Sequence, residues 1–283
     1  MIGNEFQSKK ADVFLKLHYE PKILLLPNAW DVITTKIYEQ LGFKAIGTTS
    51  AGIAATLGYP DGEVMTLEEN LSIVKRILEK TSLPVSVDIE AGYSLTLEGA
   101  IKAAEAALEV GAVGINLEDS TGNDDNPFFN TSEVVNRIKG IRSMAEAHGI
   151  HLVINLRTDV YMLKKEKPQL KFKHTVERAN IYKESGADCI FVPDMGDFNE
   201  KIIKELVKEI NAPLNIIAGP NIPPVQKLEG IGVARLSFGP RPMRAMLSLL
   251  YRIKKELIEK GTYETMSSDT LTYSEINEIL AKN

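Results

Sequence analysis

The sequence predicts an α/β fold, a (β/α)8 barrel of the TIM type with an extra C-terminal helix, on three observations. Eight short apolar runs rich in Val, Ile and Leu alternate with longer segments of helical periodicity, which is typical of βαβ units. No G-x-G-x-x-G follows the first run, so an open dinucleotide-binding sheet is disfavoured. The length of 283 residues suits two average domains or one barrel, and the eight strands favour a single barrel domain over 1–283.

The strands and helices of the barrel follow from local patterns. Strands are expected at the apolar runs 23–27, 45–50, 84–90, 113–119, 151–157, 189–194, 213–218 and 233–238. Helices are expected between them, among others at 66–80, 97–110 and 131–148. Thr66 stands three residues before Glu69, which is the spacing of a capping box at a helix N-terminus. Three glycines that precede strands are expected to be helix C-caps: Gly42, Gly111 and Gly186.

Further helices flank the barrel in the sequence. One is expected over 1–20 and one over 240–260, and the extra C-terminal helix falls within 262–283, where the pattern is clearest at 272–281. The extra helix has no barrel strand to serve. It can dock on a neighbouring subunit, swapped between copies, or pack on its own barrel, and the pattern leaves both open. We expect a homo-oligomer, a dimer or a tetramer.

Composition and charge exclude several classes of protein. Hydrophobic residues make up 44% and charged residues 25%, which describes a globular chain rather than a disordered or collagen-like one. The 33 basic and 38 acidic residues give a net charge of −5 without a basic stripe, so nucleic acid is not an expected partner. Apolar runs are well short of the roughly 20 residues that cross a bilayer, and no signal peptide is recognisable. With Cys189 as the single cysteine, a cytoplasmic protein without a membrane partner is expected.

Polar side chains at the C-terminal ends of barrel strands face the active site in this fold. After the second strand, Thr49, Ser50 and Ala51 offer hydroxyl groups and unhindered N–H donors that can hold a carboxylate. The third and fourth strands end in carboxylates, which would repel one another without a cation: Asp88, Glu90, Glu118 and Asp119. Oxygen ligands without His or Cys favour Mg²⁺, with Mn²⁺ as the alternative. Solvated acidic loops are the competing interpretation, and it has most weight for Glu90 and Asp119.

The remaining strand ends supply candidates for binding an anionic substrate. Arg157 ends the fifth strand, where its guanidinium can grip a carboxylate or a phosphonate while a metal polarises the substrate carbonyl. The sixth, seventh and eighth strands lead to Asp194, Asn215, Arg235, Ser237, Arg241 and Arg244. For the arginines after the eighth strand, a role on a helix surface is equally compatible with the pattern. The four histidines lie away from predicted strand ends, and Cys189 is expected in the core.

Seven segments, taken in order and at their spacing, resemble the isocitrate lyase/phosphoenolpyruvate mutase superfamily from Leu24 to about Leu250. They read LPNAWD, GFKAIGTTSAGIAATLGYPD, PVSVDIEAGY, GAVGINLEDS, INLRTDVY, GADCIFVPD and GVARLSFGPRPMRAM. The resemblance implies a Mg²⁺-dependent enzyme that acts on a small 2-oxo or 2-hydroxy carboxylic acid through an enolate-type intermediate.

The resemblance also implies residue roles. Asp88 matches the principal metal ligand, Glu118 the next acid of the metal shell, and Glu90 an acid that reaches the metal through water. Catalytic positions are implied for Asp61, Glu118 and Arg157. The family's substrate-binding positions fall on Thr49, Ser50, Ala51, Arg157, Asp194 and Arg244, to which the strand-end rule adds Asn215.

Two departures from the family pattern leave three functions open. The segment 120–130 has no Cys, Lys or His, whereas the lyase branch carries a catalytic cysteine loop there and the phosphonate branch a lysine. Pro193 stands where the phosphonate branch has a histidine. The leading hypothesis is a lyase that cleaves a C–C bond or removes a carboxylate. The alternatives are P–C bond chemistry and an oxo-acid-binding protein without activity, and in each case 120–130 is expected to act as a mobile lid.

Overall fold

The computed structural model describes residues 2–163, 167–193, 196 and 198–281, and it confirms the predicted barrel. Its strands are all parallel and form one sheet in the order β1-β9-β8-β7-β6-β5-β4-β3-β2. The strands are β1 (Leu24–Leu26), β2 (Asn28–Ala29), β3 (Ile46–Thr48), β4 (Val85–Asp88), β5 (Gly114–Glu118), β6 (Val153–Arg157), β7 (Cys189–Phe191), β8 (Leu214–Ile217) and β9 (Arg235–Ser237).

The barrel closes at Pro27, which divides the first predicted strand into β1 and β2. β1 pairs with β9 on one side, and β2 pairs with β3 on the other. Proline has no backbone N–H to donate, but the Pro27 carbonyl accepts a hydrogen bond of 2.9 Å from the Gly47 N–H. β1 and β2 together therefore form one of the eight staves of a barrel.

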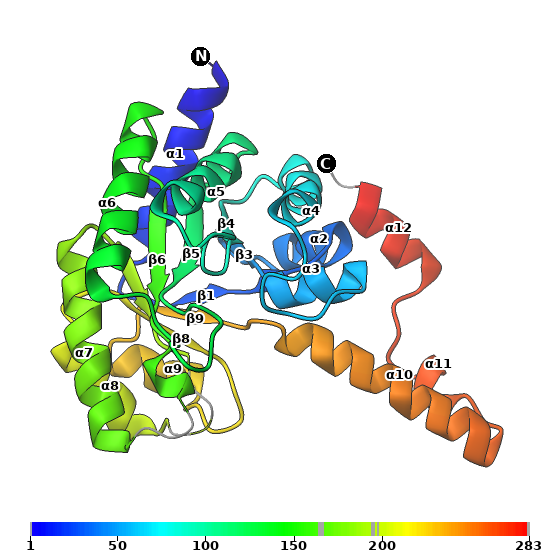
Figure 1. Ribbon diagram of the computed structural model, residues 1–283. Coiled ribbons are helices and arrows are strands. Elements are labelled where there is room, and N and C mark those ends of the chain that lie inside the picture. The colour runs from blue at the N-terminus through cyan, green and yellow to red at the C-terminus, as the bar shows by residue number, and fades with distance from the viewer. Residues whose placement is uncertain (1, 164–166, 194–195, 197, 282–283) are drawn as a thin grey trace.

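Helices surround the strands on the outside of the barrel (Figure 1). They are α1 (Ile2–Leu17), α2 (Val32–Gln40), α3 (Ser50–Leu57), α4 (Leu67–Glu79), α5 (Leu97–Glu109), α6 (Thr131–Ala147), α7 (Pro168–Glu184), α8 (Glu200–Glu209), α9 (Val225–Gly230), α10 (Arg241–Lys260), α11 (Glu264–Ser267) and α12 (Tyr273–Ala281), with a 3-10 turn at Val160–Met162. The capping box of Thr66 and Glu69 begins α4 as predicted. None of the described helices is both long and apolar enough to cross a membrane.

Helix α1 closes the N-terminal end of the barrel. Gly114 begins β5 on the same inward face as Asn116, and a methyl group there would come within 2.7 Å of the Phe14 ring. The Phe14 ring makes an edge contact with His18 at 4.8 Å between centroids, and His18 Nδ1–H donates to the Phe14 carbonyl at 2.8 Å. The buried imidazole of His18 thus lies at the N-terminal end of the barrel.

Helix α10 leaves the barrel and projects as an arm (Figure 1). Its far half carries exposed apolar side chains, among them Leu250 with 60%, Tyr251 with 76% and Ile258 with 71% of its surface accessible. The chain then returns, and α12 packs on α2 of the same barrel. Of the two placements left open for the C-terminal helix, the structure shows α12 on its own barrel.

The buried imidazole makes stability depend on pH. Burial first, and then the nearby Arg235 charge, lower the pKa of His18 from 6.5 to about 4. Between these values the unfolded chain binds a proton that the folded chain refuses, so the protein loses stability as pH falls from 6.5 to about 4. Compared with a His18→Gln variant, the wild type should lose about 3 kcal/mol more over this interval. Urea unfolding at several pH values measures the difference, and parallel curves for the two proteins would contradict it.

Candidate active site

A pocket of about 210 Å³ opens at the C-terminal ends of the strands, where the sequence predicted the active site. Nine of the predicted residues line it: Thr49, Ser50, Ala51, Asp61, Asp88, Arg157, Ser237, Arg241 and Arg244. The pocket wall also includes Asn116 of β5, which the sequence reasoning did not select for a role. These residues come from separate strands and loops that the barrel brings together.

Five other predicted residues do not line the pocket, and two of them, Asp119 and Arg235, are described further below. Glu90 and Glu118 lie beside it, with their carboxylates held by other groups, as described below. Asn215 is fully buried in the barrel interior, between Phe191 and Arg235 in the strand register. Asp194 lies outside the described residues.

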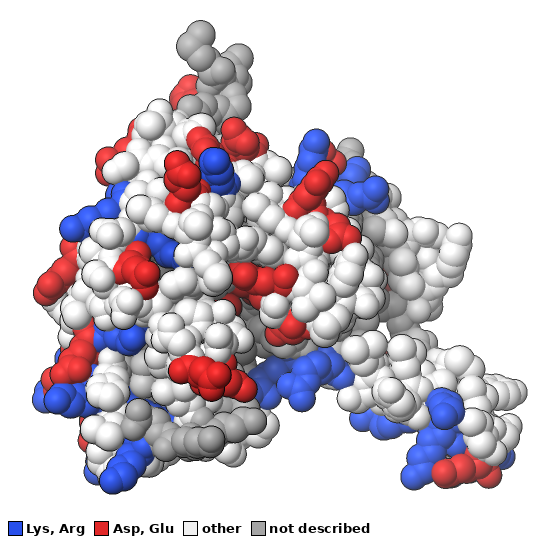
Figure 2. Space-filling model, in the orientation of Figure 1, with Lys and Arg blue, Asp and Glu red and all other residues white. Residues whose placement is uncertain are grey.

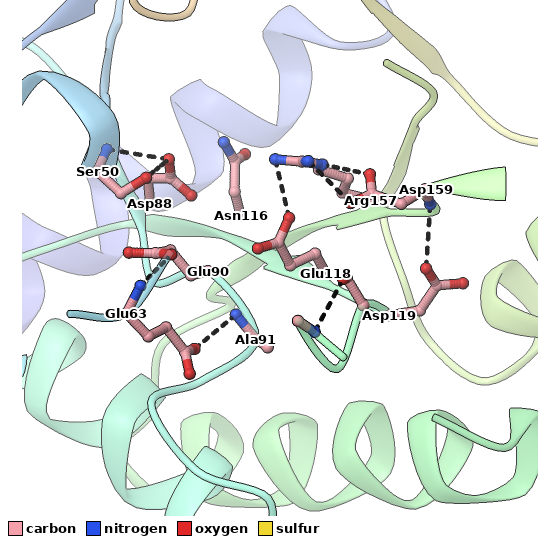
Figure 3. Close-up of polar contacts among 12 residues, drawn as sticks. Ser50, Glu63, Asp88, Glu90, Ala91, Asn116, Glu118, Asp119, Arg157 and Asp159 are labelled. Carbon is pink, nitrogen blue, oxygen red and sulfur yellow. Dashed lines mark hydrogen bonds and ion pairs between the residues drawn. The ribbon is translucent and has the colours of Figure 1, made fainter. Parts of the chain in front are cut away.

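Asp88 is anchored on the first residue of α3. The Ser50 N–H and hydroxyl both donate to Asp88 Oδ2, at 3.1 and 2.9 Å (Figure 3). The first N–H groups of a helix have no intrahelical partner, so a carboxylate is stabilised there. Thr49 is the N-cap of this helix, and its side chain accepts from the Gly52 N–H. The sequence did not predict α3, whose small residues carry only a weak helical pattern.

The carboxyl group of Glu90 turns toward a loop that the sequence reasoning missed. Glu90 Oε2 accepts from the Glu63 N–H at 2.8 Å, and the Tyr93 hydroxyl donates to Oε1 at 3.3 Å. Glu63 Oε1 in turn accepts from the Ala91 and Tyr93 N–H groups at 2.9 and 2.8 Å. The Asp-Gly pair before Glu63 was the available signal, because it marks a tight turn that folds the loop back.

Crowding changes the acidity of the pocket carboxyl groups. Burial, followed by the charges of Asp88 and Asp61, raises the pKa of Glu90 to about 8. Asp61 lies at the rim, where partial desolvation and the Asp88 charge raise its pKa. Glu90 and Asp61 therefore hold a proton more readily than exposed carboxyl groups do.

Arg157 is engaged by carboxylates of its own chain. Its Nη1 lies 2.8 Å from Glu118 Oε2, while Nε and Nη2 donate to the two oxygens of Asp159 at 2.5 and 2.8 Å (Figure 3). Burial alone would lower the pKa of Arg157, but Asp159 and Glu118 outweigh it and raise that pKa. Burial raises the pKa of Glu118, against the opposing effect of Arg157. The Arg157 guanidinium, which was expected to bind a substrate carboxylate, thus binds Asp159.

Asp119 holds the scaffold behind the pocket. It follows Glu118 directly, so the pleat of the strand directs it to the opposite face. Its Oδ2 accepts from Thr158, Arg178 and Tyr182, at 2.9 to 3.1 Å, and its Oδ1 accepts from the Asp159 N–H at 3.1 Å. This fully buried carboxylate is neither a pocket residue nor a solvated loop residue.

The segment 120–130 is a hairpin-like excursion fixed at its base. Ser120 and Phe128 form an antiparallel bridge, and the Thr121 hydroxyl donates to the Asn126 carbonyl. The Phe129 N–H donates to the Asp119 carbonyl at 3.0 Å, which ties the excursion to β5. Its role as a closing lid stays a prediction.

A basic wall faces the carboxylates. Figure 2 shows Lys and Arg atoms gathered at the start of α10, across from Asp and Glu atoms at the barrel mouth. Arg241 and Arg244 are the pocket residues of this helix. Arg241 packs over Gly219, where a methyl group would come within 3.0 Å of its Nη2. Within the described part of the chain, neither guanidinium forms an ion pair, unlike that of Arg157.

The carboxylate oxygens at the C-terminal end of the barrel can hold Mg²⁺ in one binding mode, through Asp88 and water. Among the described residues, no three His, Cys, Asp or Glu side chains converge as a preformed ligand set, so Asp88, Glu90 and Glu118 are not assembled for direct coordination. Asp88 Oδ2 is taken by Ser50, while Oδ1 remains available to the pocket. Mg²⁺ commonly binds through one or two carboxylates and keeps several waters. Asp88 with water-mediated contacts to its acidic neighbours is compatible with that mode.

Comparisons with known proteins agree with this geometry. The family described as phosphoenolpyruvate phosphomutase matches residues 14–258. An uncharacterized protein of Mycobacterium tuberculosis is 33% identical over 83% of this chain and 84% of its own. The 2-methylisocitrate lyase of Halalkalibacterium halodurans is 27% identical over 97% of this chain and 91% of its own. A Burkholderia cenocepacia protein provisionally described as a lyase/mutase superposes with a TM-score of 0.90 at 28% identity, over 98% of this chain and 97% of its own. The chain belongs to the phosphoenolpyruvate phosphomutase family, within the superfamily that its motifs resemble, and is an enzyme of this lyase and mutase class.

Removing the Asp119 carboxylate should unfold the scaffold rather than alter the pocket chemistry. Asp119→Ala leaves the buried partners Tyr182 and Thr158 and the Arg178 charge without their acceptor, so we expect a loss of about 3–5 kcal/mol of unfolding free energy. Tyr182→Phe removes one hydrogen bond and should cost about 1 kcal/mol. Urea unfolding at neutral pH checks both values. A loss below 1 kcal/mol for Asp119→Ala would show that Asp119 does not support the scaffold.

Proposed function

We propose that this pocket is the active site of a Mg²⁺-dependent lyase that cleaves a C–C bond, or removes a carboxylate, in a small 2-oxo or 2-hydroxy carboxylic acid. The observation that carries the proposal is the opposition of charges across one pocket. Asp88 offers an anchored carboxylate on one side, and on the other Arg241 and Arg244 offer cations that form no ion pair with any described residue. A metal-binding end and an anion-binding end are what a small diacid requires. The similarity to a 2-methylisocitrate lyase supports the C–C lyase class.

Each pocket residue then has a role in the proposed reaction. Asp88 holds Mg²⁺, with Glu90 and Glu118 acting through bound water, and Mn²⁺ satisfies the same oxygen ligands. When bound, the ion polarises the substrate carbonyl and stabilises negative charge on its oxygen. Ala51 and the Thr49 hydroxyl contact the near carboxylate, while Ser50, both of whose donors are taken by Asp88, acts by holding that residue in place. Asn215 has a supporting role from beneath the pocket, and Asp194 remains a predicted contact of the substrate.

The anionic far end of the substrate is assigned to the arginine wall. Because Arg157 is occupied by Asp159 and Glu118, Arg244 and Arg241 are the cations free to bind a second carboxylate. Arg157 instead sets the orientation and charge of Glu118. This division differs from the expectation that Arg157 itself grips the substrate in a bidentate manner.

Proton transfer is assigned to the carboxyl group of Asp61. In a 2-hydroxy acid, a base removes the hydroxyl proton, the adjacent C–C bond breaks, and its electron pair forms an enolate that must be protonated. Asp61 lines the pocket, and burial together with the Asp88 charge raises its pKa, which makes it a stronger base for taking up and returning a proton than an exposed aspartate. Arg157 lines the pocket and Glu118 lies behind it, and together they stabilise the charge that develops.

Turnover of diacids tests the proposal. Purified protein with Mg²⁺ should consume oxaloacetate or a member of a panel of 2-hydroxy diacids. Asp88→Asn should lower kcat/KM by about a thousandfold, since metal catalysis supplies several kcal/mol to the transition state. Product formation followed by NMR measures it. The matched control is Asp12→Asn, an exposed aspartate on α1 at the opposite end of the barrel, which should leave turnover unchanged.

The same assay separates the alternative functions. Phosphonopyruvate consumed in phosphorus NMR, with no diacid turned over, would replace the lyase by P–C bond chemistry. Tight Mg²⁺-dependent oxo-acid binding without turnover would indicate a binding protein. If the protein is a lyase, Arg241→Gln and Arg244→Gln should raise KM for a diacid, whereas Arg252→Gln, further along α10, should not.

We also propose that the chain forms a homo-oligomer, a dimer or a tetramer, by exchange of the α10 arm with a second copy. The exposed apolar side chains of the arm have nothing to cover them in one chain, and contiguous exposed apolar surface on a projecting helix marks an interaction site. A second copy carries an identical arm, so a two-fold exchange, in which each arm packs on the other copy, covers the apolar surface of both arms.

Charged substitutions on the arm test the exchange. Light scattering after size exclusion should report a multiple of the 31.3 kDa chain mass for the wild type. Leu250→Glu with Ile258→Glu should shift the protein to the single-chain mass, whereas Arg252→Glu, an exposed position on the other side of α10, should not. A wild type that elutes as a single chain at micromolar concentration would rule out the exchange.

A further inference from the structure

A fully buried arginine lies beneath the pocket. Arg235 of β9 has no exposed surface and is the largest side chain buried to that degree among the described residues. Its Nη2 donates to Asn116 Oδ1 at 3.1 Å, while Nε and Nη1 have no hydrogen-bond partner in the described part of the chain. No ion pair within the described residues involves it. Arg137, the other buried arginine among the described residues, donates to the backbone carbonyls of Ala91 and Ser94 at 2.6 and 2.9 Å, so the arrangement at Arg235 differs from it.

The surroundings of Arg235 are polar and electrically uncompensated. Asn155 and Asn215 are fully buried beside it, and Asn155 Oδ1 and both amide atoms of Asn215 are unpaired. Burial lowers the pKa of Arg235 to about 10, against the opposing effect of Asp88. At neutral pH the guanidinium is therefore still charged. Below it, the same charge helps to lower the pKa of His18.

Asn116 connects this charge to the pocket. Its Oδ1 accepts from both Arg235 and Asn155, at 3.1 and 2.7 Å. Two donors on one oxygen fix the orientation of the amide, so the Nδ2–H₂ group is the part left for other partners. Asn116 lines the pocket and lies between Asp88 and Arg157 (Figure 3). The amide donor is thus aimed into the space where substrate would lie.

We propose that Arg235 is a positioning residue that fixes the Asn116 amide as a donor to the substrate and supplies, from below, the positive charge that holds the anionic oxygen of the bound oxo-acid. This inference rests on the proposed function of the pocket. A buried charge without an ion pair is destabilising, and replacing it with an apolar side chain of similar volume is often neutral or stabilising. A charge retained at this cost beside a pocket indicates a functional role.

Opposite responses to two ligands distinguish this role from a structural one. We would titrate Mg²⁺ alone, and oxalate at saturating Mg²⁺, into the wild type and into Arg235→Met, Arg235→Lys and Arg142→Met. Oxalate serves as a stable dianion that resembles a 2-oxo acid and its enolate. Arg142 pairs with Asp188 at the other end of the barrel and is the matched control for loss of an arginine.

Arg235→Met should weaken oxalate binding about tenfold or more, the order expected when one full charge acts across a partly buried site. It should leave Mg²⁺ binding unchanged or tighter, because a repulsive cation is removed, and its melting temperature should be equal to or above that of the wild type. Arg235→Lys should keep most of the oxalate affinity, and Arg142→Met all of it.

Two results would overturn the inference while leaving the proposed function in place. One is wild-type oxalate affinity in Arg235→Met, and the other is loss of both ligands together with a lower melting temperature. If the wild type itself binds neither Mg²⁺ nor oxalate, the proposed function fails and the inference with it. Should Arg235→Met not fold, Asn116→Leu carries the test, because it removes the amide donor and must show the same selective loss of oxalate.

Discussion

The crowding of carboxylates where β4 and β5 end is the constraint on which the rest of the site depends. A closed parallel barrel brings these strand ends within a few ångströms of one another, and ionised acids at such distances destabilise the fold unless each has a partner. Each acid here has a different one. Asp88 is held by the start of α3, Glu90 by a loop N–H, Glu118 by an arginine, and Asp119 by a network on the outer face. Of these four acids, Asp88 is the one that lines the pocket.

Local and periodic features of the fold were predictable from the sequence, whereas the hydrogen-bond and ion-pair partners of the charged side chains were not. The capping box at Thr66 depends on residues three apart, and the strands depend on apolar runs, so both could be found without tertiary information. The pleat could also have separated Glu118 from Asp119. By contrast, the pairing of Arg157 with Asp159 depends on a loop conformation after β6, and the position of Glu63 depends on a fold-back across the pocket.

Residue identity alone also could not show depth within the barrel. Asn215 and Arg235 are adjacent in the strand register and read as strand-end candidates, yet both lie wholly inside. Whether an inward side chain reaches the mouth depends on the tilt and stagger of the strands, which a linear pattern does not contain. The polar interior that results sets this barrel apart from one filled with branched apolar side chains.

Helix α10 joins two features that have been described separately, the arginines at its start and the exposed apolar surface toward its end. A helix of 20 residues is a stiff rod of about 30 Å, so the orientation of one end restricts the orientation of the other. A contact that immobilises the far end of α10 also restricts the motion of Arg241 and Arg244. The conformational entropy of these side chains is then already reduced before substrate binds, so binding costs less. If the arm associates as proposed, ligand affinity and self-association are thermodynamically linked, and substrate affinity becomes a function of protein concentration.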